Sequence, residues 1–155
     1  MPIAASMHYF LHEGGSPTKP PLVLIHGAGG NLLSWPPELR RLSGARVFTL
    51  DLPGHGKSEG PGRQSVADYT AGVVRFLNAA DLSRAMFVGH ALGGAIALVL
   101  AINHPDRVAG IGLISSGPRM PIPASVLENA SNPATFILAV NSFLELMHIP
   151  QAEKK

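Results

Sequence analysis

The chain has 155 residues, 46% of them hydrophobic and 14% charged, so it can bury the core of one globular unit but is too short for two ordinary domains. Its net charge is only +2 and its Lys and Arg residues are scattered, which excludes the basic stripe of a protein that binds nucleic acid or an anionic membrane. The absence of cysteine excludes disulfides, thiolate metal sites and a cysteine nucleophile.

The first ten residues lack the basic start and apolar run of a secretory signal, so we expect a cytoplasmic protein. The longest apolar run, residues 93–102, is about half the roughly 20 residues that a membrane-spanning helix needs. We interpret this run as a buried helix and expect no membrane partner.

Four runs of aliphatic and aromatic residues predict strands that are buried on both faces. They are residues 22–25, 46–50, 86–88 and 108–114, and each is followed by a turn rich in Gly, Pro or Ser. A shorter run, residues 9–11, precedes two glycines and is a candidate for an antiparallel edge strand.

The intervals between these runs predict helices over residues 32–42, 65–80 and 92–103. In the second interval Ser65 is a suitable N-cap, and apolar residues recur at the spacing of one helix face. Strands that alternate with helices predict an α/β fold: a mostly parallel sheet with right-handed crossover helices on both faces.

The character of the chain changes after Pro118, because prolines recur and an apolar helical stretch follows over residues 135–147, before Pro150. We therefore expect two parts, residues 1–118 and residues 119–155. The helical stretch either packs on the core, covers a substrate pocket or forms an interface.

The most informative segment is Gly89-His90-Ala91-Leu92-Gly93-Gly94, between a predicted strand and a predicted helix. The pattern Gly-x-Ser-x-Gly has this context in a nucleophile elbow, where a sharp turn presents the central serine and the glycines make room for it. Here Ala91 takes the place of the serine, and it has no hydroxyl with which to attack a carbonyl.

A literal Gly-x-Ser-x-Gly occurs at residues 56–60 and would nominate Ser58. No strand precedes it and Pro61 prevents a helix from following it directly, so we reject this match. A dinucleotide-binding pattern after residue 25 is weakened by Leu32 at its third glycine, and a phosphate-binding loop ending at Ser58 is excluded by Asp51 at its first glycine.

Three motifs in this order resemble those of the α/β-hydrolase superfamily: His26-Gly27-Ala28-Gly29-Gly30 with Trp35, residues 51–58, and residues 89–94. The resemblance covers roughly residues 8–118 and implies that Ala91 occupies the nucleophile position, between the elbow glycines Gly89 and Gly93. It also implies an oxyanion hole formed by the main-chain N–H groups of Ala28 and Leu92.

In that superfamily the triad acid and histidine follow the nucleophile on later strands, which this chain does not contain. The resemblance therefore implies the N-terminal half of a hydrolase core over residues 1–118 and the start of a helical cap over residues 119–155. An uncovered sheet edge would then favour self-association or complementation by the missing C-terminal half.

Two origins of Ala91 stay open: a serine exchanged by design, and a natural loss. In the first case the parent hydrolyses an ester, thioester, amide or carbon–carbon bond of a small, fairly apolar substrate, and this chain is inactive. The alternatives are a natural pseudoenzyme that binds a ligand and a cofactor-free, non-hydrolytic member of the superfamily. No cofactor and no metal is expected.

The seven histidines receive different interpretations. We expect His26 and His55 to organise loops, because no second ligand stands at metal-binding spacing. His90 neighbours residue 91 but is expected to point in another direction, which argues against a role as general base. The remaining histidines are expected at the surface or its boundary: His8, His12, His104 and His148.

Overall fold

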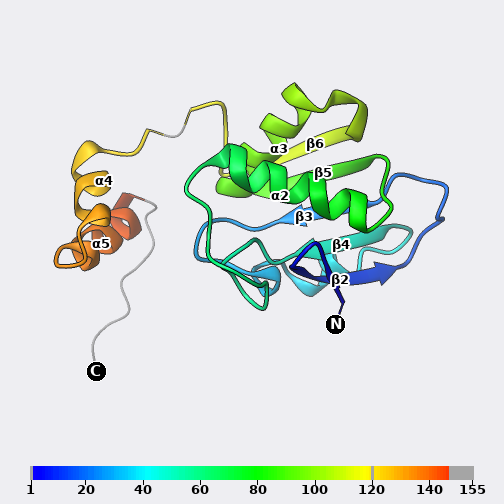
Figure 1. Cartoon of the computed structure of the whole chain (residues 1–155), viewed down its shortest axis with the longest axis horizontal. Coiled ribbons are helices and arrows are strands. Elements are labelled where there is room, and N and C mark those ends of the chain that lie inside the picture. The colour runs from blue at the N-terminus through cyan, green and yellow to red at the C-terminus, as the bar shows by residue number, and fades with distance from the viewer. Residues whose placement is uncertain (1, 120, 147–155) are drawn as a thin grey trace. The chain divides into compact units, whose positions relative to one another are not determined.

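A six-stranded sheet with the order β1-β2-β4-β3-β5-β6 is the centre of the first part of the chain (Figure 1). The computed structural model describes residues 2–119 and 121–146. The strands are β1 (Ile3–Ala4), β2 (Met7–Glu13), β3 (Leu22–Ile25), β4 (Arg46–Leu50), β5 (Ala85–His90) and β6 (Val108–Ile114). All four predicted strands are present, and the third extends further than predicted. The prediction that they are buried on both faces is wrong for β6, because this strand lies at an edge of the sheet and none of its residues is buried.

The central pairings are parallel, as predicted. Strand β3 lies between β4 and β5, and β5 also pairs with β6 in parallel. Strand β2 pairs with β4 in the antiparallel direction. The prediction that this strand lies at the edge is wrong, because positive φ angles of 49° at Ala5 and 64° at Ser6 turn the chain back and place β1 outside it.

Two long helices have nearly the predicted bounds: α2 (Val66–Ala79) and α3 (Leu92–Asn103). Ser65 caps α2, since its Oγ accepts the N–H of Asp68 at 3.1 Å. The helix predicted over residues 32–42 is wrong: the chain forms the 3-10 turn η1 (Leu32–Ser34) and the one-turn helix α1 (Pro37–Arg40). Pro36 is the reason, because it disfavours helical geometry at Trp35, which has a ψ of 135°.

Helices cover both faces of the sheet. On one face α2 and α3 bury the large cluster that includes Phe76, Phe87 and Ile96. On the other face Trp35 packs with Leu24 and Val47 beneath the η1–α1 segment. A last 3-10 turn, η2 (Pro105–Arg107), leads into β6. These layers bring the ends of β3 and β5 and the start of α3 together at one side of the sheet.

Strand β6 forms one edge of the sheet within the described residues, and its apolar side chains remain partly exposed. Ile111, Leu113 and Ile114 are 38%, 37% and 42% exposed, and the strand carries no charged residue. An edge of this kind offers unpaired backbone groups and apolar surface to another chain.

The chain divides into two compact units, Met1–Pro118 and Arg119–Lys155. In the second unit α4 (Ala124–Ser131) packs against α5 (Phe136–Leu146), with Val126 and Ala139 buried. Helix α5 agrees with the predicted helix except that Met147, like His148 and Pro150, lies outside the described residues. Helix α4 was not predicted, because it has only eight residues and only two large apolar side chains, Val126 and Leu127.

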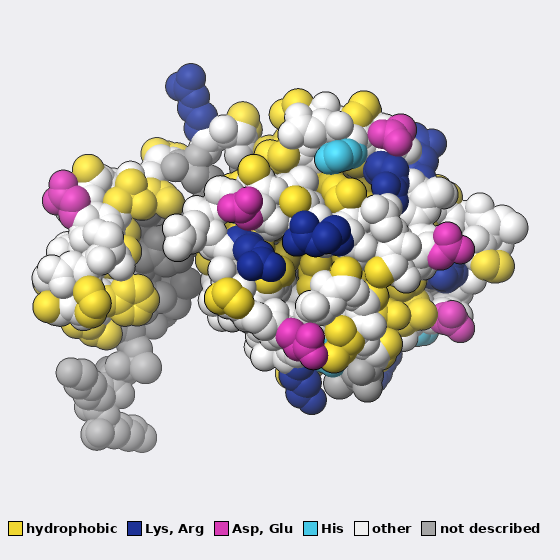
Figure 2. Space-filling model, viewed as in Figure 1, with side chains coloured by type: hydrophobic (Ala, Val, Ile, Leu, Met, Phe, Trp, Pro, Cys, Tyr) yellow, Lys and Arg dark blue, Asp and Glu magenta, His cyan; other side chains and the backbone are white. Residues whose placement is uncertain are grey.

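Charged side chains of both signs are interspersed on the face shown in Figure 2. Exposed apolar side chains of the second unit include Leu127, Phe136, Ile137 and Leu138. Among the helices of the described residues, none combines the length and the apolar character needed to cross a bilayer.

Candidate functional site

Ala91 occupies a strained turn between β5 and α3. Its φ of 48° and ψ of −109° form a combination that side-chain-bearing residues rarely adopt and that costs about 1–3 kcal/mol. The end of β6 holds this turn: the N–H of Ala91 donates to the carbonyl oxygen of Ile114 at 3.0 Å, and the Oγ of Ser116 donates to the carbonyl oxygen of Ala91 at 2.9 Å. The conformation of residue 91 is therefore imposed by its surroundings.

Three glycines make this turn sterically possible. A Cβ on Gly89 would overlap the backbone of Gly93 and Gly94, and a Cβ on Gly94 would overlap the side chain of Ser116. A Cβ on Gly93 would overlap the carbonyl oxygen of Ile25, where α3 crosses the end of β3. The predicted glycines Gly89 and Gly93 thus allow strand, turn and helix to approach closely.

The loop of residues 26–30 lies directly against this turn. A Cβ on Gly27 would come within 2.9 Å of His90 Nδ1 and 3.5 Å of Ala91 Cβ. The loop closes on itself through the N–H of Gly30, which donates to the carbonyl oxygen of Gly27 at 3.1 Å. The fold therefore brings Ala28 and Ala91 into adjacent segments, although they are 63 positions apart in the sequence.

Two predicted main-chain donors, the N–H groups of Ala28 and Leu92, belong to these segments. Ala28 is exposed in the loop, and Leu92 is the first residue of α3. Within residues 2–119 and 121–146, neither N–H donates a hydrogen bond to a protein acceptor. Free N–H groups at a helix start and in an adjoining loop attract a negatively charged oxygen.

A cavity of about 570 Å³ opens beside the same loop. Its apolar wall comes mainly from the η1–α1 segment, which contributes Trp35, Pro36 and Leu39, and from Ile114 at the end of β6. The exposed side chain of His90 also lines the cavity. The cavity thus presents mainly apolar surface beside His90, the residue that precedes Ala91.

His26 and His55 connect this loop to the segment that follows β4. His26 is 1% exposed; its Nδ1 lies 2.7 Å from the carbonyl oxygen of Gly27, and its Nε2 accepts the N–H of Leu52 at 3.0 Å. The Nε2 of His55 accepts the N–H of Gly29 at 3.0 Å. The prediction that both histidines organise loops is confirmed.

The pKa of His26 is lowered from its ordinary value of 6.5, chiefly because burial penalises the charged imidazolium. The neighbouring His55, whose ring centre is 5.0 Å away, lowers it further, while the bond to Gly27 and the charge of Asp51 act in the opposite direction. His26 is therefore held in its neutral form.

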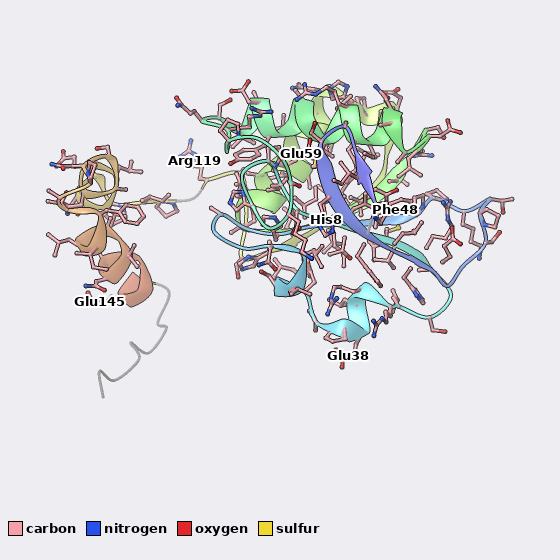
Figure 3. The ribbon with its side chains drawn as sticks, turned by 60° about the horizontal axis from the view of Figure 1, so that its bottom comes forward. His8, Glu38, Phe48, Glu59, Arg119 and Glu145 are labelled. Atoms are coloured by element: carbon pink, nitrogen blue, oxygen red, sulfur yellow. The ribbon has the colours of Figure 1, made fainter. Side chains whose placement is uncertain are left out.

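Asp51 fixes the neighbouring loops from inside the fold. Its Oδ1 accepts the N–H of Leu32 at 2.7 Å, and its Oδ2 accepts the N–H of Lys57 at 3.0 Å. The same Oδ2 lies 2.7 Å from Nδ1 of His8. The expectation of a surface position for His8 is wrong, because it is only 4% exposed and lies within the fold beneath the loops (Figure 3).

Ser58 is part of this loop structure and is not presented to the cavity. Its Oγ donates to the carbonyl oxygen of Asp51 and accepts the N–H of His8 at 2.9 Å. The structure thus agrees with the rejection of the literal Gly-x-Ser-x-Gly at residues 56–60. His12 and His104 are half-buried, as expected for boundary positions, and His148 lies outside the described residues.

Comparison with known proteins gives a consistent result. The sequence profile of the alpha/beta hydrolase fold matches residues 20–149. The dihydrolipoyllysine-residue acetyltransferase component of the acetoin cleaving system of Pseudomonas putida is 41% identical over 106 residues, which make up 67% of this chain and 28% of that protein. The 2-hydroxymuconate semialdehyde hydrolase of Pseudomonas sp. strain CF600 is 38% identical over 132 residues, 77% of this chain and 44% of that protein.

Among solved structures, the enol-lactonase from Burkholderia xenovorans LB400 superimposes with a TM-score of 0.74 at 29% sequence identity. The similarity covers 89% of this chain and 54% of the enol-lactonase. The chain thus spans about half, or less, of the length of each of these proteins.

Proposed function

The chain belongs to the alpha/beta hydrolase fold family, and on this premise we propose that it is the N-terminal half of a serine-type hydrolase whose nucleophile position is occupied by Ala91. The observation that carries the proposal is the strained turn at residue 91, with free main-chain donors in the two segments beside it. This arrangement suits a reaction in which negative charge develops on a carbonyl oxygen.

In the proposed mechanism a serine at position 91 attacks the substrate carbonyl carbon. The oxygen of the resulting tetrahedral intermediate takes up hydrogen bonds from the N–H groups of Ala28 and Leu92, and the leaving group departs to give an acyl-enzyme that water hydrolyses. The histidine and acid that move the proton belong to the rest of the fold. Because both donors are main-chain groups, the oxyanion site does not depend on the side chain at residue 91.

The proposed substrate is a small, fairly apolar molecule in which an ester, thioester, amide or carbon–carbon bond is hydrolysed. Support comes from the cavity wall of Trp35, Pro36, Leu39 and Ile114, which offers mainly apolar surface beside the turn. With alanine at position 91 there is no hydroxyl to acylate, so the chain itself is proposed to be inactive. Loss of a catalytic serine lowers kcat by a factor on the order of 10⁶ in the best-studied serine hydrolase series.

A second candidate function is ligand binding without catalysis, in a natural pseudoenzyme. The observation that favours it is that the cavity and the free N–H groups are present with alanine at position 91. A cofactor-free, non-hydrolytic reaction in the same cavity is the third candidate, since such chemistry would also use main-chain donors.

We further propose that residues 119–155 begin a helical cap and that the remaining strands of the core follow in a longer parent. The uncovered edge at β6 supports this, because Ile111, Leu113 and Ile114 are left partly exposed there. The proposed partners are a small-molecule substrate and, at this edge, either the C-terminal half of the fold or a second copy of the chain.

The decisive test is fluorophosphonate labelling of the full-length parent in two forms, with Ala91 and with Ala91→Ser. Labelling at residue 91 in the serine form alone would support the serine-hydrolase proposal. A Ser58→Ala change in the serine form is the matched control, and it should leave the labelling in place. If the folded serine form is not labelled, a binding protein or a non-serine reaction becomes the better proposal.

A further inference from the structure

The two peptide units on either side of Ala28 are each held by a different histidine. The unit that joins Gly27 to Ala28 is held through its carbonyl oxygen, which lies 2.7 Å from Nδ1 of His26. The unit that joins Ala28 to Gly29 is held through its N–H, which donates to Nε2 of His55 at 3.0 Å. Since a peptide unit is planar, fixing its carbonyl oxygen also fixes the direction of its N–H.

Both imidazole rings are restricted to one tautomer. The partner of His55 Nδ1 is the carbonyl oxygen of Pro53 at 3.0 Å, which can only accept, so Nδ1 carries the hydrogen. The partner of Nε2 is the N–H of Gly29, which can only donate, so Nε2 must have a free lone pair. The same reasoning applies to His26, between the carbonyl oxygen of Gly27 and the N–H of Leu52.

From this geometry we propose that His55, together with His26, is a positioning residue that aims the N–H of Ala28 at the oxyanion site only while its imidazole is neutral. The inference rests on the proposed function for the use that is made of Ala28. Protonation of His55 would place a hydrogen on Nε2 opposite the N–H of Gly29. The bond would then be lost, and one of the two peptide units beside Ala28 would be released.

Few other charged groups lie near the hydrogen bond between His55 and Gly29. The rings that face it are His26, with ring centres 5.0 Å apart, and Tyr69 of α2, with ring centres 6.2 Å apart. The carboxylate of Asp51, in the same loop, is already engaged by two N–H groups and by His8, and Lys57 is exposed. Of the imidazoles beside this loop, His26 and His55 hydrogen-bond to its backbone. His90 lies against Gly27 from the other side.

The direct test is a trans-hydrogen-bond ¹⁵N–¹⁵N coupling, measured by NMR on the labelled 155-residue chain with Ala91 in place. We expect one coupling between Gly29 N and His55 Nε2 and a second between Leu52 N and His26 Nε2. The first should disappear as the pH is lowered and the His55 ring nitrogens shift to the imidazolium position. Absence of the Gly29–His55 coupling at high pH, in a sample that shows the Leu52–His26 coupling, would overturn the proposal.

Two substitutions separate positioning from packing. In His55→Gln the amide oxygen can replace Nε2 as an acceptor and does not titrate, whereas His55→Leu fills space without an acceptor. In the parent with Ala91→Ser, we expect His55→Leu to lower the rate of fluorophosphonate labelling about 10-fold, as for the loss of one net hydrogen bond. His55→Gln should recover most of that rate. Its labelling rate should also depend less on pH, because the glutamine at position 55 does not titrate.

Equal labelling rates in the glutamine and leucine variants would contradict a positioning role for His55. If no serine form is labelled at all, the proposed function fails. The NMR couplings in the 155-residue chain still show whether His26 and His55 hold the loop of residues 26–30. The two failures are therefore distinguishable.

Discussion

Gly93 and Ile25 lie in direct contact where α3 crosses the end of β3, and a Cβ at residue 93 would overlap the carbonyl oxygen of Ile25. We therefore expect Gly93→Ala to lower the free energy of unfolding by about 1–3 kcal/mol, the usual cost of overpacking a rigid site. Urea unfolding followed by circular dichroism measures the change.

The matched control is Gly72→Ala, which makes the same change in the interior of helix α2. The nearest atoms that a Cβ there would meet belong to Met7, Pro53 and Arg75, at ordinary contact distances of 3.6–3.8 Å. We expect this variant to be more stable by about 0.5–1 kcal/mol, because alanine favours the helix. Equal effects of the two substitutions would show that the contact with Ile25 does not restrict residue 93.

The backbone strain at Ala91 should be visible in stability. Ala91→Gly is expected to raise the free energy of unfolding by about 1 kcal/mol, because glycine adopts a φ of 48° without steric cost. Ala95→Gly, one turn into the same helix, should lower it by about 1 kcal/mol. A loss of stability at both positions would mean that the turn stores no strain.

The lowered pKa of His26 makes stability depend on pH in a defined direction. Below the ordinary value of 6.5 the unfolded chain binds a proton that the folded chain resists, so the free energy of unfolding falls as the pH drops below 6.5. The stabilisation that neutral His26 contributes is fully present above pH 6.5. The loss of stability on acidification levels off below the folded-state pKa of His26.

Urea unfolding at a series of pH values tests this dependence. His26→Gln, which retains an acceptor for the N–H of Leu52, should show a smaller loss of stability on acidification than the unmodified chain. His104→Gln, at a half-buried boundary position, is the control and should change the pH dependence little. The interpretation fails if both variants follow the pH curve of the unmodified chain.

The exposed edge at β6 predicts association. We expect sedimentation velocity to show concentration-dependent self-association of the chain, and the double change Ile111→Lys and Leu113→Lys to reduce it, because charged side chains protect sheet edges. Ile102→Lys is the control; this residue is 75% exposed but belongs to helix α3 and not to the edge strand. A monomer at all concentrations, with a cooperative thermal transition, would contradict the expectation.

Much of the fold could be predicted from the sequence, because parallel strands that are buried on both faces leave continuous apolar runs. The bounds of β3, β4 and β6 agree with those runs, and the bounds of α3 agree with the predicted helix. Strand β1 was not predicted, since a strand of two residues cannot show a periodicity. The helix expected over residues 32–42 does not form, because Pro36 disfavours helical geometry at Trp35.

In the site, glycine spacing predicted that residues 26–30 and 89–94 form turns, and the fold brings the two turns together. The contact between His8 and Asp51 could not be predicted in the same way. It depends on the antiparallel register of β2 and β4, in which Tyr9 is opposite Leu50, and on the turn at Ala5 and Ser6. Register is set by pairing between distant segments, so no local pattern in the sequence reveals it.

The order of the strands on one side of β3 has a consequence for biosynthesis. Strands β3, β5 and β6 lie side by side in the order in which a ribosome produces them. Each new strand can therefore dock on an edge that is already in place, with its crossover helix made just before it. During translation, at about 5–20 residues per second, this side of the sheet can grow outward one strand at a time, without insertion between strands already paired.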